Sequence, residues 1–366
     1  MNPKTLPILA GVTAIAVALA FTSARYNSVS DAISDRGRQL LPGLAERSKA
    51  IAKMTVTTSD GTTTLVRDGD RMVDASGYPI RDSLASTLTT SLSVLKIEER
   101  KTDDPARYAD LGLAAPDAKD GAGTRVVATS ADGATLADVV LGRREAAVGG
   151  MSGGQYVRTA ANARSFLVRG NVRVPPDRSG WFNTQLLNIA EADLTTVTAP
   201  DFKVARKGDE LALDPPLSAS DAPPATGNAK PEPGAEPAAA TGDANETKPA
   251  AAAPELDPNK LNRVKRMFAP LTFIDVRKAD ASAPSGPAVT LETKDGLAIK
   301  LTTFPTTDDE VGAWARLEAS AQNKDAEPQA KTMSEEFAGY DFKIGTGDYN
   351  TLILKRADFA KKPPRS

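Results

Sequence analysis

Two residue types that carry much enzyme chemistry are missing from this 366-residue sequence. It contains no histidine and no cysteine. Without cysteine there can be no disulfide, no thiolate metal site and no cysteine nucleophile. Without histidine the chain lacks the commonest general base and the commonest transition-metal ligand. Carboxylate pairs, a Ser/Lys dyad and oxygen-ligated calcium or magnesium remain available, and each needs positive evidence of its own.

A serine and a lysine stand at the spacing of one known nucleophilic dyad. Ser93 and Lys96 form a Ser-x-x-Lys sequence, as in penicillin-recognising enzymes. The pair falls at the end of a predicted helix, and no Ser-Asp-Asn or Lys-Thr-Gly accompanies it. Ser83 and Ser86, earlier in that helix, have no lysine three residues onward. We therefore interpret the Ser93 spacing as coincidence and the other two serines as helix surface.

Three loop-like segments also invite a functional interpretation and do not support one. The glycine-rich residues 148–154 lack the Gly-Lys-Ser/Thr of a phosphate loop, and the acidic residues 308–310 lack the alternating ligand spacing of a calcium loop. Asp103 and Asp104 precede a proline, which is typical of a turn. We predict no catalytic, cofactor-binding or metal-ligating residue, and no cofactor.

The remaining candidates are a basic stretch and two tryptophans. Residues 263–266 (RVKR) could contact anionic lipid or phosphate, but Val264 faces the predicted core, which favours the solvated face of a helix. Trp181 and Trp314 are the only tryptophans, and we expect each to anchor a core rather than a ligand site. A formal net charge of -2 supplies no cationic field, so no nucleic-acid partner is expected.

The N-terminus reads as a membrane segment. Residues 6–21 are apolar or neutral, and no charge occurs between Lys4 and Arg25. A membrane-crossing helix needs roughly 17 to 25 such residues, so we predict an anchor within residues 1–24, followed by a juxtamembrane segment, 25–50. A cleaved secretory signal also fits, because small residues recur with one residue between them near positions 18–24. Both alternatives export the rest of the chain. The predicted location is the bacterial inner membrane, single-pass, with the C-terminal bulk in the periplasm or outside the cytoplasmic membrane.

The elements that must position any site follow one order twice, after about residue 51 and again after about residue 191. Each copy begins with alternating strands about Asp-Gly or Gly-Asp turns. A helix follows. The first starts at Pro79 and carries an apolar stripe, and the second starts at Asp257-Pro258, an N-cap and first-turn pair. Further hairpins complete each copy.

The predicted fold class is therefore α+β, with one N-terminal transmembrane helix followed by two tandem, duplicated antiparallel sheet-plus-helix modules. The first module spans residues 51–190, and the second spans 191–214 and 257–366. Residues 215–256 are rich in proline and alanine with almost no large apolar side chains, which predicts a disordered insertion.

Several short motifs resemble those of one family. They are Pro42-Gly43-Leu44, residues 108–113 (YADLGL) with Pro116, Leu141-Gly142, residues 156–158 (YVR), and Trp181 with Leu186-Leu187. Their order and spacing resemble DUF4340, a family of uncharacterised bacterial proteins. The resemblance implies one N-terminal transmembrane segment and genes beside gliding-type ABC transporter components. No catalytic residues are defined for the family, so none is carried over.

We expect a non-catalytic, membrane-anchored extracytoplasmic scaffold whose partners are integral membrane or envelope proteins, including, by the resemblance, ABC transporter components. The membrane contact is assigned to residues 6–21. The alternative is a binding module for a cell-wall polymer or small envelope ligand in a cleft between the two modules. A carboxylate-based glycan hydrolase is a third hypothesis, and it needs two acidic side chains roughly 5 to 10 Å apart in a cleft.

Overall fold

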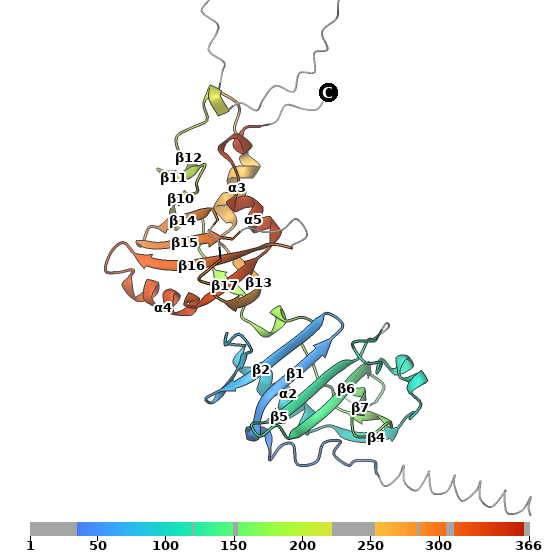
Figure 1. Cartoon of the computed structure of the whole chain (residues 1–366). Helices are drawn as coiled ribbons and strands as arrows, with labels where there is room; N and C mark the ends of the chain where they lie inside the picture. Colours follow the sequence, from blue (N-terminus) through green and yellow to red (C-terminus); the bar gives the residue numbers. More distant parts are fainter. Residues whose placement is uncertain are drawn as a thin grey trace, which may run out of the picture. The chain divides into compact units, whose positions relative to one another are not determined.

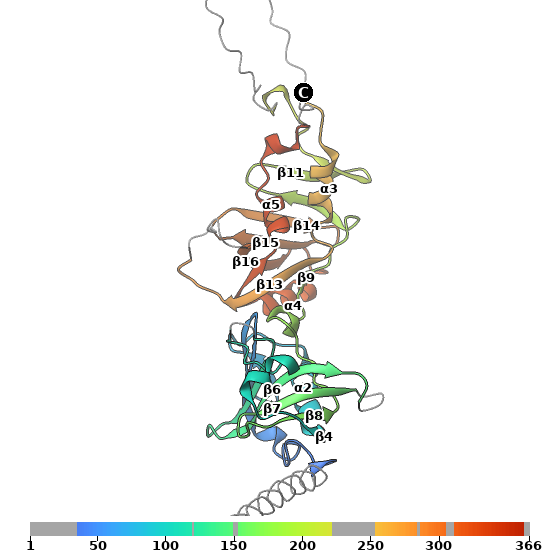
Figure 2. The same cartoon turned by 90° about the vertical axis from the view of Figure 1, so that its right-hand side faces the viewer.

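The computed structural model describes residues 35–118, 121–148, 153–221, 253–283, 286–304 and 311–361. The chain divides into two compact units: unit 1 ends at Asn183 and unit 2 begins at Thr184. Each unit is built on one antiparallel sheet (Figures 1 and 2).

The sheet of unit 1 has eight strands in the order β3-β2-β1-β5-β6-β7-β8-β4. They are β1 (Ile51–Thr58), β2 (Gly61–Asp68), β3 (Arg71–Asp74), β4 (Lys96–Arg100), β5 (Thr124–Ser130), β6 (Thr135–Glu145), β7 (Gly154–Thr159) and β8 (Ser165–Arg169). Helix α2 (Asp82–Ser93) lies along one face of this sheet (Figure 1). Alternation along β1 buries Met54 and Val56 on the helix face, while Lys53 is exposed on the other.

The sheet of unit 2 has nine strands in the order β12-β11-β10-β14-β15-β16-β17-β13-β9. They are β9 (Gln185–Leu187), β10 (Leu194–Thr198), β11 (Lys203–Lys207), β12 (Glu210–Leu213), β13 (Leu271–Lys278), β14 (Ala288–Thr293), β15 (Leu297–Thr303), β16 (Ala313–Ala321) and β17 (Tyr340–Ile344). Its helices are α3 (Pro258–Arg266), α4 (Glu327–Phe337) and α5 (Thr346–Leu352). Helix α4 packs along β16, and α3 contacts α5 and β12.

The two sheets have the same strand order, with β10, β11, β12, β13, β14, β15, β16 and β17 in the places of β1, β2, β3, β4, β5, β6, β7 and β8. In both units a helix follows the third strand. The extra strand β9 also has a counterpart, because Gln39 forms an isolated antiparallel bridge with Lys96 of β4. Two-residue turns begin with Gly69 and Gly208, both with positive φ, in the corresponding hairpins. The repeat of strand patterns seen in the sequence is thus present in the structure.

The two predicted helix starts differ in accuracy. Asp257 accepts a hydrogen bond from the amide of Asn259 and Pro258 occupies the first turn, so the predicted cap of α3 is confirmed. Helix α2 begins at Asp82, later than predicted, because Pro79 instead bridges Val73 at the edge strand β3. The predicted apolar stripe of α2 is nevertheless buried, since Leu88 and Leu92 are 2% and 1% exposed.

A second layer covers the other face of the unit 1 sheet around β6 to β8. The chain between β4 and β5 forms two short 3₁₀ helices, Pro105–Arg107 and Ala109–Leu111. It buries a cluster made of Tyr108, Leu113, Val140, Tyr156 and Leu167. The middle of this sheet is therefore apolar on both faces, which explains the continuous burial of the Phe-Leu-Val run in β8.

The fold-class prediction is wrong. The described chain is mostly two large antiparallel sheets with few helices rather than balanced sheet-plus-helix modules. The physical reason is that strand pairing continues through eight or nine strands, and each counterpart helix is short, 12 residues for α2 and 9 for α3. No transmembrane helix is found either: none of the helices in the described ranges is long and apolar enough to cross a membrane. The predicted segment 6–21 lies outside those ranges, as does most of the predicted insertion.

Candidate functional site

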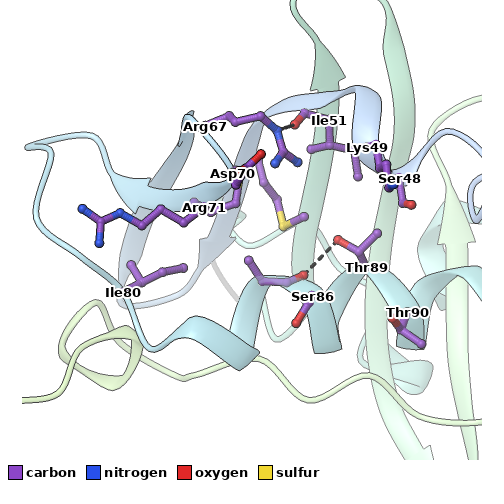
Figure 3. Close-up of a pocket in the computed structure, with 13 residues that line it drawn as sticks. Ser48, Lys49, Ile51, Arg67, Asp70, Arg71, Ile80, Ser86, Thr89 and Thr90 are labelled. Carbon is purple, nitrogen blue, oxygen red and sulfur yellow. Dashed lines mark hydrogen bonds between the residues drawn. The ribbon is translucent and has the colours of Figure 1, made fainter.

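A groove of about 380 Å³ lies in unit 1 between one flank of α2 and the β1–β3 end of the sheet (Figure 3). Its lining comes from the 3₁₀ turn Ser48–Ala50, three strands, the segment leading into α2 and the helix itself. The lining residues are Ser48, Lys49, Ile51, Met54, Arg67, Asp70, Arg71, Met72, Ile80, Ala85, Ser86, Thr89 and Thr90.

An irregularity in β1 sets the position of the central arginine. The register of β1 against β5 shifts between Ile51 and Lys53, which marks a bulge at the start of the strand. Arg67 of β2 donates a hydrogen bond from Nε to the carbonyl of Ile51 at 2.7 Å. This bond orients the guanidinium beside Ile51 (Figure 3). Within the described chain its two Nη groups make no hydrogen bond or ion pair, so they are available to a ligand.

The groove is cationic. Lys49, Arg67 and Arg71 contribute three positive charges and Asp70 one negative charge, a formal sum of +2. All four side chains belong to exposed residues, and none is ion-paired to another described residue. Arg71 extends away from the centre of the groove, whereas Lys49 and Arg67 both lie close to Ile51 (Figure 3).

Hydroxyl groups of α2 form the polar wall. Ser86 and Thr89 donate to the helix carbonyls of Ser83 and Ala85, at 3.0 and 2.9 Å. Their lone pairs can therefore still accept hydrogen bonds. Thr90 is exposed, and its hydroxyl donates to no group in the part of the chain that is described. This wall can both accept and donate hydrogen bonds to a polar ligand.

The floor of the groove is apolar. Ile51, Met54, Ile80 and Ala85 are each no more than 6% exposed and pack beneath the charged rim. Met72 of the edge strand adds a flexible thioether side chain, which adapts to irregular apolar surfaces. A cationic rim over an apolar floor suits a ligand with one anionic and one apolar part.

The corresponding arginine in unit 2 is engaged internally. Arg206 occupies on β11 the position of Arg67 on β2, and its Nε likewise donates to the first residue of the preceding strand, Leu194, at 2.8 Å. Its Nη1 donates to the carbonyl of Asp209 at 2.7 Å, and its Nη2 donates to that of Glu191. Both units therefore use an arginine to hold the bulged strand start, but only Arg67 keeps its Nη groups unoccupied among the described residues.

Two buried carboxylates form ion pairs that hold strands and loops together. Asp74, at the end of β3, receives Nε and Nη2 of Arg178 at 3.1 and 2.6 Å, and the amide of Ser76 at 2.7 Å. Burial acts to raise the pKa of Asp74, but the hydrogen bonds from Arg178 and Ser76 outweigh it and leave that pKa below its usual value. Asp341 in β17 is fully buried and accepts from Arg316 of β16 at 2.8 Å.

Among the described residues that were candidates in the sequence, Ser86 alone lines the groove. Ser93 is buried and donates to the carbonyl of Thr90, while Lys96 is exposed on β4, so they form no dyad. Arg263 and Arg266 are exposed on α3, whereas the Lys265 side chain is only 14% exposed and pairs with Glu191 at 3.4 Å. Residues 149–152 and 308–310 lie outside the described chain. In the described ranges, no group of three or more acidic side chains could hold a metal ion.

The two tryptophans have different environments. Trp181 is 1% exposed, which confirms a core role. Trp314 is only partly buried, and its ring has the guanidinium of Arg277 at 4.2 Å and the amino group of Lys343 at 5.7 Å. The core prediction is therefore wrong for Trp314, because alternation along β16 places it beside Arg316 on the polar face of the sheet.

The motifs that carry the family resemblance, at residues 108–113 and 141–142, have packing roles in unit 1. Tyr108 donates its hydroxyl hydrogen to the carbonyl of Ala163 and sits in the second-face cluster. Gly112 has φ +66°, and a side chain at Gly142 would place its Cβ 2.5 Å from the carbonyl oxygen of Leu111. The Leu-Gly-Leu and Leu-Gly sequences thus allow two backbone segments to touch.

Comparison with protein families agrees with these motifs. The pattern of a family described as a domain of unknown function, DUF4340, matches residues 71–289, which is more than half of the chain. This chain belongs to the DUF4340 family. The DUF4340 match begins in β3 and ends in β14, so it spans parts of both units and includes the Tyr108 and Gly142 motifs. Residues 42–44 precede it. Comparisons with curated proteins and with solved structures gave no match.

The groove was not predicted from the sequence. Its cations are separated by up to 22 positions along the chain, from Lys49 to Arg71, and no motif links them. One usable signal existed: the arginines at 67 and 206 occupy corresponding places in the two copies.

Proposed function

We propose that this DUF4340 protein is a non-catalytic binding protein of the bacterial cell envelope, in which unit 1 contacts another envelope component through the α2 groove. The observation that carries the proposal is the groove itself, with Lys49 and Arg67 unpaired among the described residues above an apolar floor. Unpaired cations that converge on a concave surface are typical of a binding site.

The envelope location is part of the same proposal. It is supported by the charge-free run between Lys4 and Arg25, which fits an export signal. Integral membrane proteins, including gliding-type ABC transporter components, are the partners that the family resemblance favours. The arrangement of α2 against the sheet gives a rigid surface on which a partner could be held.

Co-purification with matched variants tests this proposal. Tagged full-length protein would be isolated from native membranes as wild type, as the double variant Lys49→Ala/Arg67→Ala, and as Lys53→Ala. Lys53 is an exposed lysine of β1 on the opposite face of the same sheet and is unpaired among the described residues, so it controls for charge removal. Mass spectrometry would quantify each recovered envelope component.

We expect at least one component to be recovered with wild type and Lys53→Ala and to fall at least tenfold with the double variant. Circular dichroism and thermal unfolding would establish that the variant is folded. Equal recovery of every component from all three folded proteins would contradict the assignment of the groove.

The alternative, a module that binds a small envelope ligand, is favoured by one specific feature. The groove volume of about 380 Å³ lies in the range of small-molecule sites. That site lies within unit 1. The alternative predicts that a small molecule extracted from the co-purified wild-type protein is absent from the double variant.

A further inference from the structure

The duplicated arginines show which feature of the groove is specialised. Arg67 and Arg206 share the Nε bond to a strand-start carbonyl, at 2.7 and 2.8 Å. Holding the start of the strand in this way therefore requires only the hydrogen bond from Nε. In unit 2 the remaining guanidinium hydrogens are taken by the carbonyls of Asp209 and Glu191. In unit 1 no described group accepts the corresponding hydrogens, although the Nε bond to the strand-start carbonyl is the same.

A guanidinium held through Nε presents its two Nη groups as a planar fork. Such a fork matches the two oxygens of a carboxylate or phosphate. Lys49 supplies a second cation near Ile51, on the same side of the groove as Arg67 (Figure 3). These groups can satisfy an oxyanion without displacing any ion pair found in the described chain.

The floor determines what must be attached to that oxyanion. Met54 and Ile80 are buried, and Met72, which pairs with Arg67 in the β2–β3 register, also lines the groove. Burying apolar ligand surface against them is favourable because it removes that surface from water. A bare anion would leave that surface wet, whereas an alkyl or ring substituent would cover it.

We infer that the α2 groove binds an oxyanion, a phosphate or carboxylate, that carries an apolar substituent, with the Nη groups of Arg67 and the amino group of Lys49 holding the anion. The inference rests on the small-ligand form of the proposed function and specifies the ligand chemistry of that site. The source of the anion can be a soluble metabolite or a lipid headgroup, since both offer the same chemistry.

Isothermal titration calorimetry with defined probes tests the inference. Inorganic phosphate, hexyl phosphate, hexanoate and hexyltrimethylammonium would be titrated into the full chain at about 50 mM salt, where charge interactions are little screened. Vesicles with and without phosphatidic acid would then distinguish a lipid headgroup from a soluble phosphate.

The expected result is that hexyl phosphate or hexanoate binds at least tenfold more tightly than inorganic phosphate, and that the ammonium compound does not bind. Arg67→Lys keeps a charge but loses the planar fork, so it should weaken hexyl phosphate at least fivefold; Lys49→Ala should do so independently. Lys53→Ala should bind as wild type.

No binding of either alkyl anion to a folded wild-type chain would overturn the inference, and so would binding that Arg67→Lys and Lys49→Ala leave unchanged. If calorimetry fails in this way but the double variant still loses an envelope component in the co-purification, the binding function stands and only the ligand class is refuted. Failure of both experiments would remove both.

Discussion

Substitution of Asp74 by Asn removes the charge from one carboxylate that fixes the edge of the unit 1 sheet while preserving its shape. The Asp74 side chain is 2% exposed, and Arg178 approaches both of its oxygens. Breaking a buried ion pair at one partner costs about 3 to 5 kcal/mol. Because the Arg178 side chain is 30% exposed and can regain water, we expect a loss at or below the bottom of that range, about 2 to 3 kcal/mol.

Thermal unfolding of the full chain at pH 7 measures this loss. A cooperative unit of roughly 150 residues shifts by about 2 to 4 °C per kcal/mol, so its transition should fall by about 4 to 12 °C. Hydrogen exchange should show the loss in β3. The matched control variant is Asp68→Asn, because Asp68 is exposed and makes no ion pair with any described residue.

The pH dependence gives a second test of the same pair. The folded-state pKa of Asp74 lies below the ordinary value of 3.8. The stabilisation is therefore fully present above that ordinary value and is lost as the pH falls through the lowered folded-state value. The difference between wild type and Asp74→Asn should shrink below about pH 4. An Asp74→Asn transition within 1 °C of wild type at pH 7, or a difference that does not change with pH, would refute the reasoning.

Three further substitutions probe packing and burial. Gly142→Ala would place a Cβ 2.5 Å from the carbonyl oxygen of Leu111 and should lower the free energy of unfolding by about 1 to 3 kcal/mol; an unchanged urea midpoint would contradict the close approach. Tyr108→Phe removes the hydrogen bond to Ala163 and should lower the free energy of unfolding by about 0.5 to 1.5 kcal/mol. Urea unfolding measures this change, and no loss would mean that the hydroxyl contributes nothing to stability. Burial raises the pKa of Asp348, so wild-type stability should fall as pH rises from the ordinary 3.8 through the raised value. Asp348→Asn should then unfold at a higher temperature than wild type at pH 7 but not at pH 3, and a lower temperature at pH 7 would contradict it.

Local sequence patterns predicted the repeated architecture because each signal is short-range. The Gly69 and Gly208 turns and the Asp257 cap depend on a few adjacent residues, and the structure contains them where expected. The balance of sheet and helix was mispredicted because it depends on how many strands pair, which is a tertiary property. The exposure of Trp314 was missed for a similar reason, since which face of β16 is covered also depends on tertiary packing.

The candidate site could not be predicted because it is assembled by tertiary contacts. The availability of Arg67 depends on which carbonyls lie near its guanidinium, and the contrast with Arg206 becomes visible only when both hydrogen-bond sets are compared. The family motifs around Tyr108 and Gly142 directed attention to the second-face packing layer, which is structurally important and separate from the groove residues.

Site-specific photo-crosslinking tests the central claim most directly. A photoreactive amino acid would replace exposed Ser86 on the rim of the groove, and in a second variant it would replace Lys53 on the opposite sheet face. In intact cells we predict a discrete adduct from position 86 that is absent from position 53 and is lost when Lys49→Ala/Arg67→Ala is added. Adducts of equal yield from both positions, or a position-86 adduct that persists in the folded double variant, would contradict the groove as the contact site.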